Sequence, residues 1–155
     1  MNIEKLQEIT KVLFANDKGL LAMDESTATC NKRFAKLGIP ETEEARRAWR
    51  ELIITTPNLA QCISGLILYD ETIRQAKKDG TLFVKIIEES GIISGIKVDA
   101  GLKDMPGHLG EKITEGLDGL NDRLTEYFQM GARFAKWRTA FTIGDEIPSQ
   151  DCIEE

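Results

Sequence analysis

The sequence predicts an α/β fold that holds about the first four β/α units of a (β/α)8 TIM barrel, as one domain over residues 1–155. Four short apolar runs alternate with segments of helical periodicity, and such runs are typical of parallel strands buried on both faces. A barrel of this kind uses ~30 residues per unit, so the chain length corresponds to about four units. A complete doubly wound α/β domain is the alternative, although no GxGxxG or GxxxxGKS/T phosphate motif is present.

The N-terminal half is expected to open with an amphipathic helix, because its apolar residues recur at helical spacing. The first strand is expected over 19–24, where an apolar run ends in Asp24. A polar turn over 25–29 and a helix over 31–37 should follow. Acidic residues over 41–44 predict the start of another helix, which runs to about Ile54, since negative charge is favourable at a helix N-terminus.

The C-terminal half continues the same alternation. The expected elements are a strand over 62–69, a helix over 82–89, a strand over 92–98, a glycine-rich loop over 101–119, a helix over 120–130 and a strand within 133–141. Asp118 is the expected N-cap of the last of these helices, and Gly131 its expected stop. Ser149 should cap a further helix just before Glu155, which predicts that the sequence is the truncated first part of a longer barrel.

Composition excludes several classes of protein. The chain carries 20 Lys and Arg against 26 Asp and Glu, a net charge of −6, which argues against a nucleic-acid-binding domain. No apolar run is long enough to cross a bilayer and no secretory signal is present, so the cytoplasm is the expected location. The 3 cysteines form no CxxC pair, and the 1 histidine has no second ligand at helical spacing, so neither a disulfide framework nor a metal site is expected.

The less common residue types have simpler expected roles. Cys30 and Cys62 are expected to be buried apolar fillers, Trp49 and Trp137 to be packing residues, and His108 to lie in a surface loop.

Charged residues at the ends of the apolar runs are the candidates for chemistry. Alternation along a strand places Lys136 on one face with Phe134 and Arg138, and Lys97 on one face with Asp99. A lysine in an apolar strand needs a carboxylate, a phosphate or a substrate to offset its desolvation. Asp24, on the first strand, is the expected carboxylate partner. On these residues alone, the alternative is a structural ion network inside the barrel.

Seven strings of the sequence resemble class I fructose-bisphosphate aldolase, in the order in which that family carries them. They are GLLAMDEST from Gly19, KRF from Lys32, TEEARR from Thr42, ISGLIL from Ile63, GIKVD from Gly95, GLDGL from Gly116 and FAKWR from Phe134. The resemblance implies a cytoplasmic barrel enzyme of glycolysis and gluconeogenesis. Such an enzyme reversibly cleaves fructose 1,6-bisphosphate to dihydroxyacetone phosphate and glyceraldehyde 3-phosphate through a lysine imine (Schiff base), with no metal and no cofactor.

The resemblance also implies roles for single residues. Asp24 resembles the acid that hydrogen-bonds the substrate and assists C–C cleavage, and Lys136 the lysine that assists carbinolamine steps and proton transfer. Lys97 and Arg138 resemble the lysine and arginine beside the imine. Substrate contacts, chiefly to the C6 phosphate, are implied for Ser26, Thr29, Lys32, Arg33 and Arg46.

The resemblance places the imine-forming lysine on a sixth strand and a proton-shuttling glutamate pair on a fifth, beyond these 155 residues. The chain alone is therefore expected to be inactive and to need a C-terminal half or self-association. A non-catalytic half-barrel interaction module and a phosphosugar-binding relic are the alternative functions. Solvated helix faces are the simpler interpretation of Lys32, Arg33 and Arg46.

Overall fold

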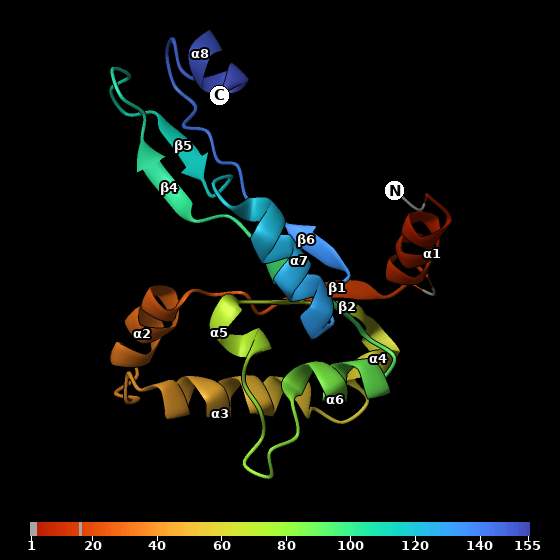
Figure 1. The fold of residues 1–155 in the computed structure, drawn as a ribbon. Coiled ribbons are helices and arrows are strands. Elements are labelled where there is room, and N and C mark those ends of the chain that lie inside the picture. Colours follow the sequence, from red (N-terminus) through yellow and green to blue (C-terminus); the bar gives the residue numbers. More distant parts are fainter. Residues whose placement is uncertain (1–2, 16) are drawn as a thin grey trace.

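A four-stranded parallel sheet forms the centre of the molecule in the computed structural model, which describes residues 3–15 and 17–155 (Figure 1). Its strands, in spatial order, are β1 (Gly19–Ala22), β2 (Ile63–Leu68), β3 (Ile93–Lys97) and β6 (Phe134–Lys136). Parallel neighbours need crossover connections, and helices supply them here. The predicted α/β class with parallel strands is confirmed, and each of the four apolar runs contains one of these strands.

Helices connect and flank these strands. They are α1 (Ile3–Leu13), α2 (Thr27–Ala35), α3 (Glu43–Ile54), α4 (Leu59–Cys62), α5 (Asp70–Ile73), α6 (Phe83–Glu89), α7 (Leu120–Met130) and α8 (Gln150–Glu154). In Figure 1, α3 and α6 lie side by side below the sheet. The main core joins alternate strand residues to these two helices and includes Leu66, Leu68, Ile96, Ile54, Phe83 and Ile87.

Side-chain caps explain where several helices begin. The Thr42 hydroxyl accepts the N–H of Ala45 at 3.2 Å at the start of α3, and acidic residues follow in its first turn. The Ser149 hydroxyl accepts the N–H of Cys152 at 3.2 Å, so this predicted N-cap is confirmed. Gly131 ends α7 in the left-handed conformation, also as predicted.

One helix start and one N-cap differ from the prediction. Helix α2 begins at Thr27 instead of residue 31, because the Ser26 hydroxyl caps it by accepting the N–H of Thr29. Polar residues that indicated a turn are therefore its first turn. The N-cap of α7 is Gly119, with a φ of 64°, and not Asp118. Glycine reaches that left-handed conformation without the steric cost that a Cβ adds.

The segment predicted as a glycine-rich loop is a β-hairpin, which corrects the sequence prediction. Strands β4 (Gly101–Asp104) and β5 (Lys112–Glu115) pair antiparallel, and with α8 they stand apart from the parallel sheet in Figure 1. Glycines at φ 79° and 83° shape the connection between the two strands, which also holds His108. The glycines therefore serve the turn and leave short strands on either side.

Expectations for the tryptophans and cysteines are half correct. Trp137 packs against the main core and Cys30 is buried, as predicted. Trp49 is 42% exposed, because the buried stripe of α3 runs through residues 46, 50 and 54 and position 49 lies off it. Cys62 is exposed at the end of the short helix α4, just before β2 begins.

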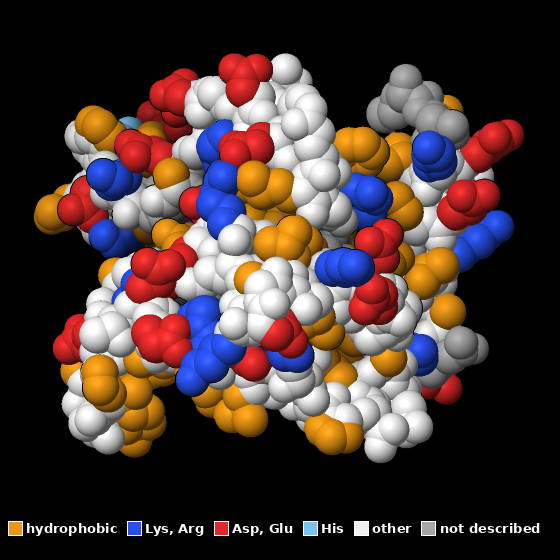
Figure 2. Space-filling view, turned by 60° about the horizontal axis from the view of Figure 1, so that its bottom comes forward, with side chains coloured by type: hydrophobic (Ala, Val, Ile, Leu, Met, Phe, Trp, Pro, Cys, Tyr) orange, Lys and Arg blue, Asp and Glu red, His pale blue; other side chains and the backbone are white. Residues whose placement is uncertain are grey.

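Figure 2 presents the side of the molecule that carries α3 and α6, where acidic and basic side chains are interspersed and leave apolar patches between them. Leu37 and Leu52 are among the exposed apolar residues of the chain. Within residues 3–15 and 17–155, none of the helices is both long enough and apolar enough to span a bilayer.

Candidate active site on the concave face of the sheet

The sheet face opposite the main core carries the charged strand-end residues. Side chains alternate along each strand, so Ile96 points into the core while Lys97 points to the other face. The pairing register sets Lys97 directly beside Lys136 on the neighbouring strand. Asp24 follows β1 at the same end of the sheet. The fold thus brings two lysines and one carboxylate from three strands together at the C-terminal end of the sheet.

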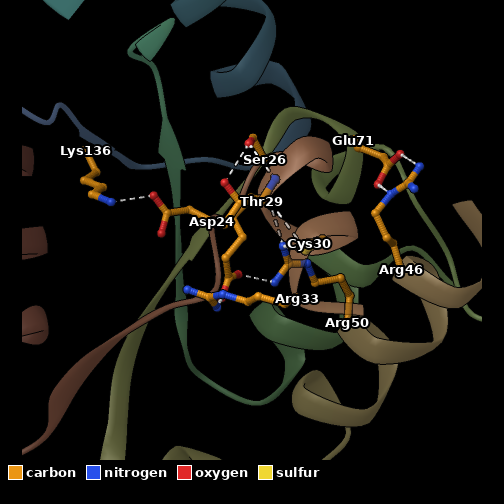
Figure 3. Close-up of polar contacts among 10 residues, drawn as sticks. Asp24, Ser26, Thr29, Cys30, Arg33, Arg46, Arg50, Glu71 and Lys136 are labelled. Atoms are coloured by element: carbon orange, nitrogen blue, oxygen red, sulfur yellow. Dashed lines mark hydrogen bonds and ion pairs between the residues drawn. The ribbon is translucent and has the colours of Figure 1, made fainter. Parts of the chain in front are cut away.

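An ion pair joins the two outer strands across this face (Figure 3). The Lys136 Nζ atom lies 2.6 Å from Asp24 Oδ2, with the two side chains 33% and 9% exposed. Strands β1 and β6 are the opposite edges of the sheet, so in a flat sheet three spacings of ~4.8 Å would separate them by about 14 Å. The contact therefore reflects a sheet that curves around this face. The predicted partnership of Asp24 with a strand lysine is confirmed for Lys136.

Lys97 has a different partner. Its Nζ atom donates to Asp99 Oδ1 at 2.5 Å and to the Asp99 carbonyl oxygen at 2.6 Å. Asp99 Oδ1 also accepts the N–H of Gly101 at 3.2 Å, while the buried Oδ2 has no hydrogen-bond partner among the described residues. Asp99 thus neutralises Lys97 locally and fixes the turn that leads into the hairpin.

The start of α2 lies next to the ion pair of Asp24 (Figure 3). The hydroxyls of Ser26 and Thr29 are 3.1 Å apart, and Lys32 and Arg33 are exposed on the same helix. The Arg33 Nη1 atom lies 2.5 Å from Glu25 Oε1. Two hydroxyls, a helix N-terminus and two cations are groups that can bind a phosphate.

Arg46 lies away from the Lys136–Asp24 pair, and Arg138 lies beyond the end of β6. Arg46 is 7% exposed, and its guanidinium donates to both carboxylate oxygens of Glu71, at 2.8 and 2.7 Å, and to Asn31 at 2.9 Å. The hydrogen bond to Glu71 raises the pKa of Arg46 above its ordinary value, and in Figure 3 this pair lies away from Lys136. Arg138 is exposed and follows β6, which ends at Lys136, so strand alternation does not fix the side on which it lies.

Sequence reasoning missed Glu25 and Arg50. The Arg50 Nη1 atom donates to Glu25 Oε2 at 2.6 Å from the inward side of α3. A usable signal was present, because Arg46 and Arg50 stand at helical spacing with Ile54 on the one buried face of α3. A buried helix face with two arginines requires carboxylates opposite it.

Comparisons with known proteins show the family of this chain. The family model "Fructose-bisphosphate aldolase class-I" matches residues 5–155. The chain belongs to the class I fructose-bisphosphate aldolase family. It is 56% identical over 154 residues to "Probable fructose-bisphosphate aldolase class 1" of Xanthomonas campestris, and 50% identical over 138 residues to "Fructose-bisphosphate aldolase 6, cytosolic" of Arabidopsis thaliana.

A solved aldolase has the same fold over the shared region. The fructose-bisphosphate aldolase of Plasmodium falciparum, in a complex with TRAP and a small-molecule inhibitor, superposes with a TM-score of 0.94 at 43% identity. The match covers 98% of this chain and 44% of that one. The Xanthomonas match covers 99% of this chain and 46% of its relative, and the Arabidopsis match 89% and 38%. This aldolase chain thus spans about half the length of the curated relatives that it matches.

Metal ligands do not gather in the described part of this aldolase chain, where no three His, Cys, Asp or Glu side chains are placed to hold an ion.

Proposed function

We propose that residues 1–155 form the first four β/α units of a class I aldolase barrel and supply one side of its active site. The reaction is the reversible cleavage of fructose 1,6-bisphosphate to dihydroxyacetone phosphate and glyceraldehyde 3-phosphate through a lysine imine. The observation that carries the proposal is the Lys136–Asp24 pair, which joins the edge strands across the concave face. Family membership and the matched solved aldolase support it.

Proton transfer is the proposed work of this pair. An ammonium group at 2.6 Å from a carboxylate can hand a proton to a substrate hydroxyl or receive one, and the carboxylate can hold the substrate hydroxyl that loses its proton on C–C cleavage. Asp24 takes the second role and Lys136 the first, in carbinolamine formation and breakdown. Lys97, paired with Asp99, and Arg138 are proposed to lie beside the imine.

Substrate binding is proposed for the start of α2. A bisphosphate of about −4 charge needs converging cations, and hydrogen bonds to ionised groups are about twice as strong as neutral ones. Ser26, Thr29, Lys32 and Arg33 are exposed or half-buried there and can contact the C6 phosphate. Arg46 is proposed to act on the same side, and its contacts with Glu71 would have to open for direct contact with the substrate.

The remaining chemistry is proposed to come from strands five to eight of the complete barrel. In this assignment the imine lysine lies on strand six, and the 155 residues alone are inactive. Strands β1 and β6 each have one neighbour among the described strands, so their free edges are where further strands or a second copy would pair. The cytosolic Arabidopsis relatives support a cytoplasmic location.

Borohydride trapping tests whether the imine-forming lysine lies outside residues 1–155. Reduction in the presence of dihydroxyacetone phosphate should leave no adduct on the 155-residue chain, as measured by intact mass. A chimera in which these residues replace the matching segment of the Xanthomonas relative should be trapped on a lysine outside this segment. In the chimera, Lys136→Met should slow trapping, while Lys85→Met, which removes an exposed ion pair on α6, should not. An adduct on the isolated chain would overturn the assignment.

A further inference from the structure

Arg50 is the largest of the fully buried side chains, at 2% exposure, and it belongs to none of the roles described above. It projects from α3 toward the connection between β1 and α2. A buried guanidinium is strongly unfavourable unless its donors are satisfied. Its partners therefore show what the fold uses it for.

Among the described residues, the hydrogen-bond partners of Arg50 lie on that connection and in the first turn of α2. Nη1 donates to Glu25 Oε2 at 2.6 Å, and Nη2 donates to the Glu25 carbonyl oxygen at 2.9 Å and to Cys30 Sγ at 3.3 Å (Figure 3). Arg33 holds the other carboxylate oxygen of Glu25 at 2.5 Å. One residue is thus fixed through its side chain and its backbone at once.

The electrostatics of Glu25 agree with a permanent clamp. Burial would raise the pKa of the Glu25 carboxyl, but the hydrogen bond from Arg50 and the charges of Arg50 and Arg33 outweigh it and hold the pKa below the ordinary value. Glu25 is therefore ionised at neutral pH.

Glu25 sits between two functional neighbours, Asp24 before it and the cap residue Ser26 after it. The last sheet hydrogen bond of this strand is made by the N–H of Met23, which donates to the Ile67 carbonyl at 3.1 Å. Helical geometry resumes only at Thr27. Between those points, the contacts of Glu25 with arginine determine where the backbone of Asp24 lies.

We propose that Arg50 is a positioning residue, which clamps Glu25 so that the Asp24 carboxylate stays on Lys136. The proposal rests on the proposed function only in taking the Asp24–Lys136 ion pair as the pair that performs proton transfer. Lysine cannot replace Arg50, because a single ammonium cannot reproduce the planar fork that reaches a carboxylate and a carbonyl together.

The test measures the exposure of the Lys136 amine without substrate. The full 155-residue chain is labelled with trace acetic anhydride, and acetylation rates of individual lysines are read by mass spectrometry. Asp24→Asn should raise the rate at Lys136 about tenfold, the factor expected when one hydrogen bond to a charged group is lost. Arg50→Lys should raise it about threefold or more, with Lys97 unchanged.

Arg47→Lys is the matched control, because Arg47 lies on the same helix and pairs with Glu44 and Glu51 instead of Glu25. It should leave the Lys136 rate unchanged. If Arg50→Lys raises the acetylation rates of Lys97 and Lys136 together, the whole chain has become more open. Glu25→Gln, which weakens the same contact from the Glu25 side, is then the deciding variant.

An unchanged Lys136 rate in the deciding variant, Arg50→Lys or Glu25→Gln, would overturn the proposal, and so would an unchanged rate in Asp24→Asn. Loss of aldol cleavage by the chimera would count against the proposed function and leave the labelling result standing. The two ideas can therefore fail separately.

Discussion

Gly95 leaves the space into which the first residue of β6 packs, and replacing it tests how the concave face is built. A Cβ at position 95 would lie 2.3, 2.4 and 2.7 Å from three atoms of the Phe134 ring. Real Cβ atoms essentially never come that close, so the Phe134 ring would have to shift to admit the added methyl group. Gly95 and Phe134 stand two residues before Lys97 and Lys136 on the same face.

Gly95→Ala should therefore destabilise the chain. Overpacking costs typically ~1–3 kcal/mol. The lower entropy of the unfolded alanine chain offsets up to ~1 kcal/mol. A net loss of about 1–2 kcal/mol in the free energy of unfolding is expected, measured by urea titration at neutral pH.

Gly19→Ala is the control. Gly19 lies on β1 of the same sheet, and a Cβ added there would have no atom within 4 Å. It should be neutral or slightly stabilising. Phe134→Leu in the Gly95→Ala background should recover part of the loss, with a coupling of ~0.5–3 kcal/mol. Equal stability of the two alanine variants would refute this view of the concave face.

Three further predictions concern single residues. The arginines around Glu25 hold the pKa of its carboxyl below the ordinary 4.5 despite burial, so the contribution of the ionised group to stability is complete above pH 4.5 and is lost as the pH falls through the lowered pKa. Glu25→Gln should therefore flatten the loss of stability between about pH 5 and 3. An unchanged dependence of the unfolding free energy on pH, measured by urea titration, would count against the clamp. Thr42→Ala should cost about 1 kcal/mol through the lost cap of α3, whereas Thr10→Ala, whose hydroxyl donates to a helix carbonyl, should cost less in the same assay. Native iodoacetamide labelling should modify Cys62 well before Cys30, since burial raises the pKa of the Cys30 thiol, and equal rates would contradict the observed packing.

Apolar periodicity and helix-capping residues were the sequence signals that predicted most of the fold. Apolar runs marked the four parallel strands, although only β2 and β3 are largely buried and the edge strands β1 and β6 are partly exposed. Thr42 and Ser149 marked helix starts because their hydroxyls satisfy free N–H groups. The hairpin of β4 and β5 was missed because strands of four residues are too short to show alternation among glycines.

The candidate site was predictable where it depends on strand ends. The pairing of Lys136 with Asp24 follows from the rule that strand carboxyl ends meet at one edge, whereas the partner of Lys97 depends on how the backbone turns after Asp99. Arg50 was missed because only apolar residues were counted as marking the buried face of a helix.

The cleavage rate of fructose 1,6-bisphosphate by the chimera tests the central claim most directly. Asp24→Asn should lower kcat by ~10²–10⁴, the usual contribution of a positioned acid or base. Asp79→Asn, which removes a carboxylate from an exposed pair with Lys77, should leave kcat unchanged. An Asp24→Asn chimera that turns over as fast as its parent would contradict the assignment of this face as one side of the aldolase active site.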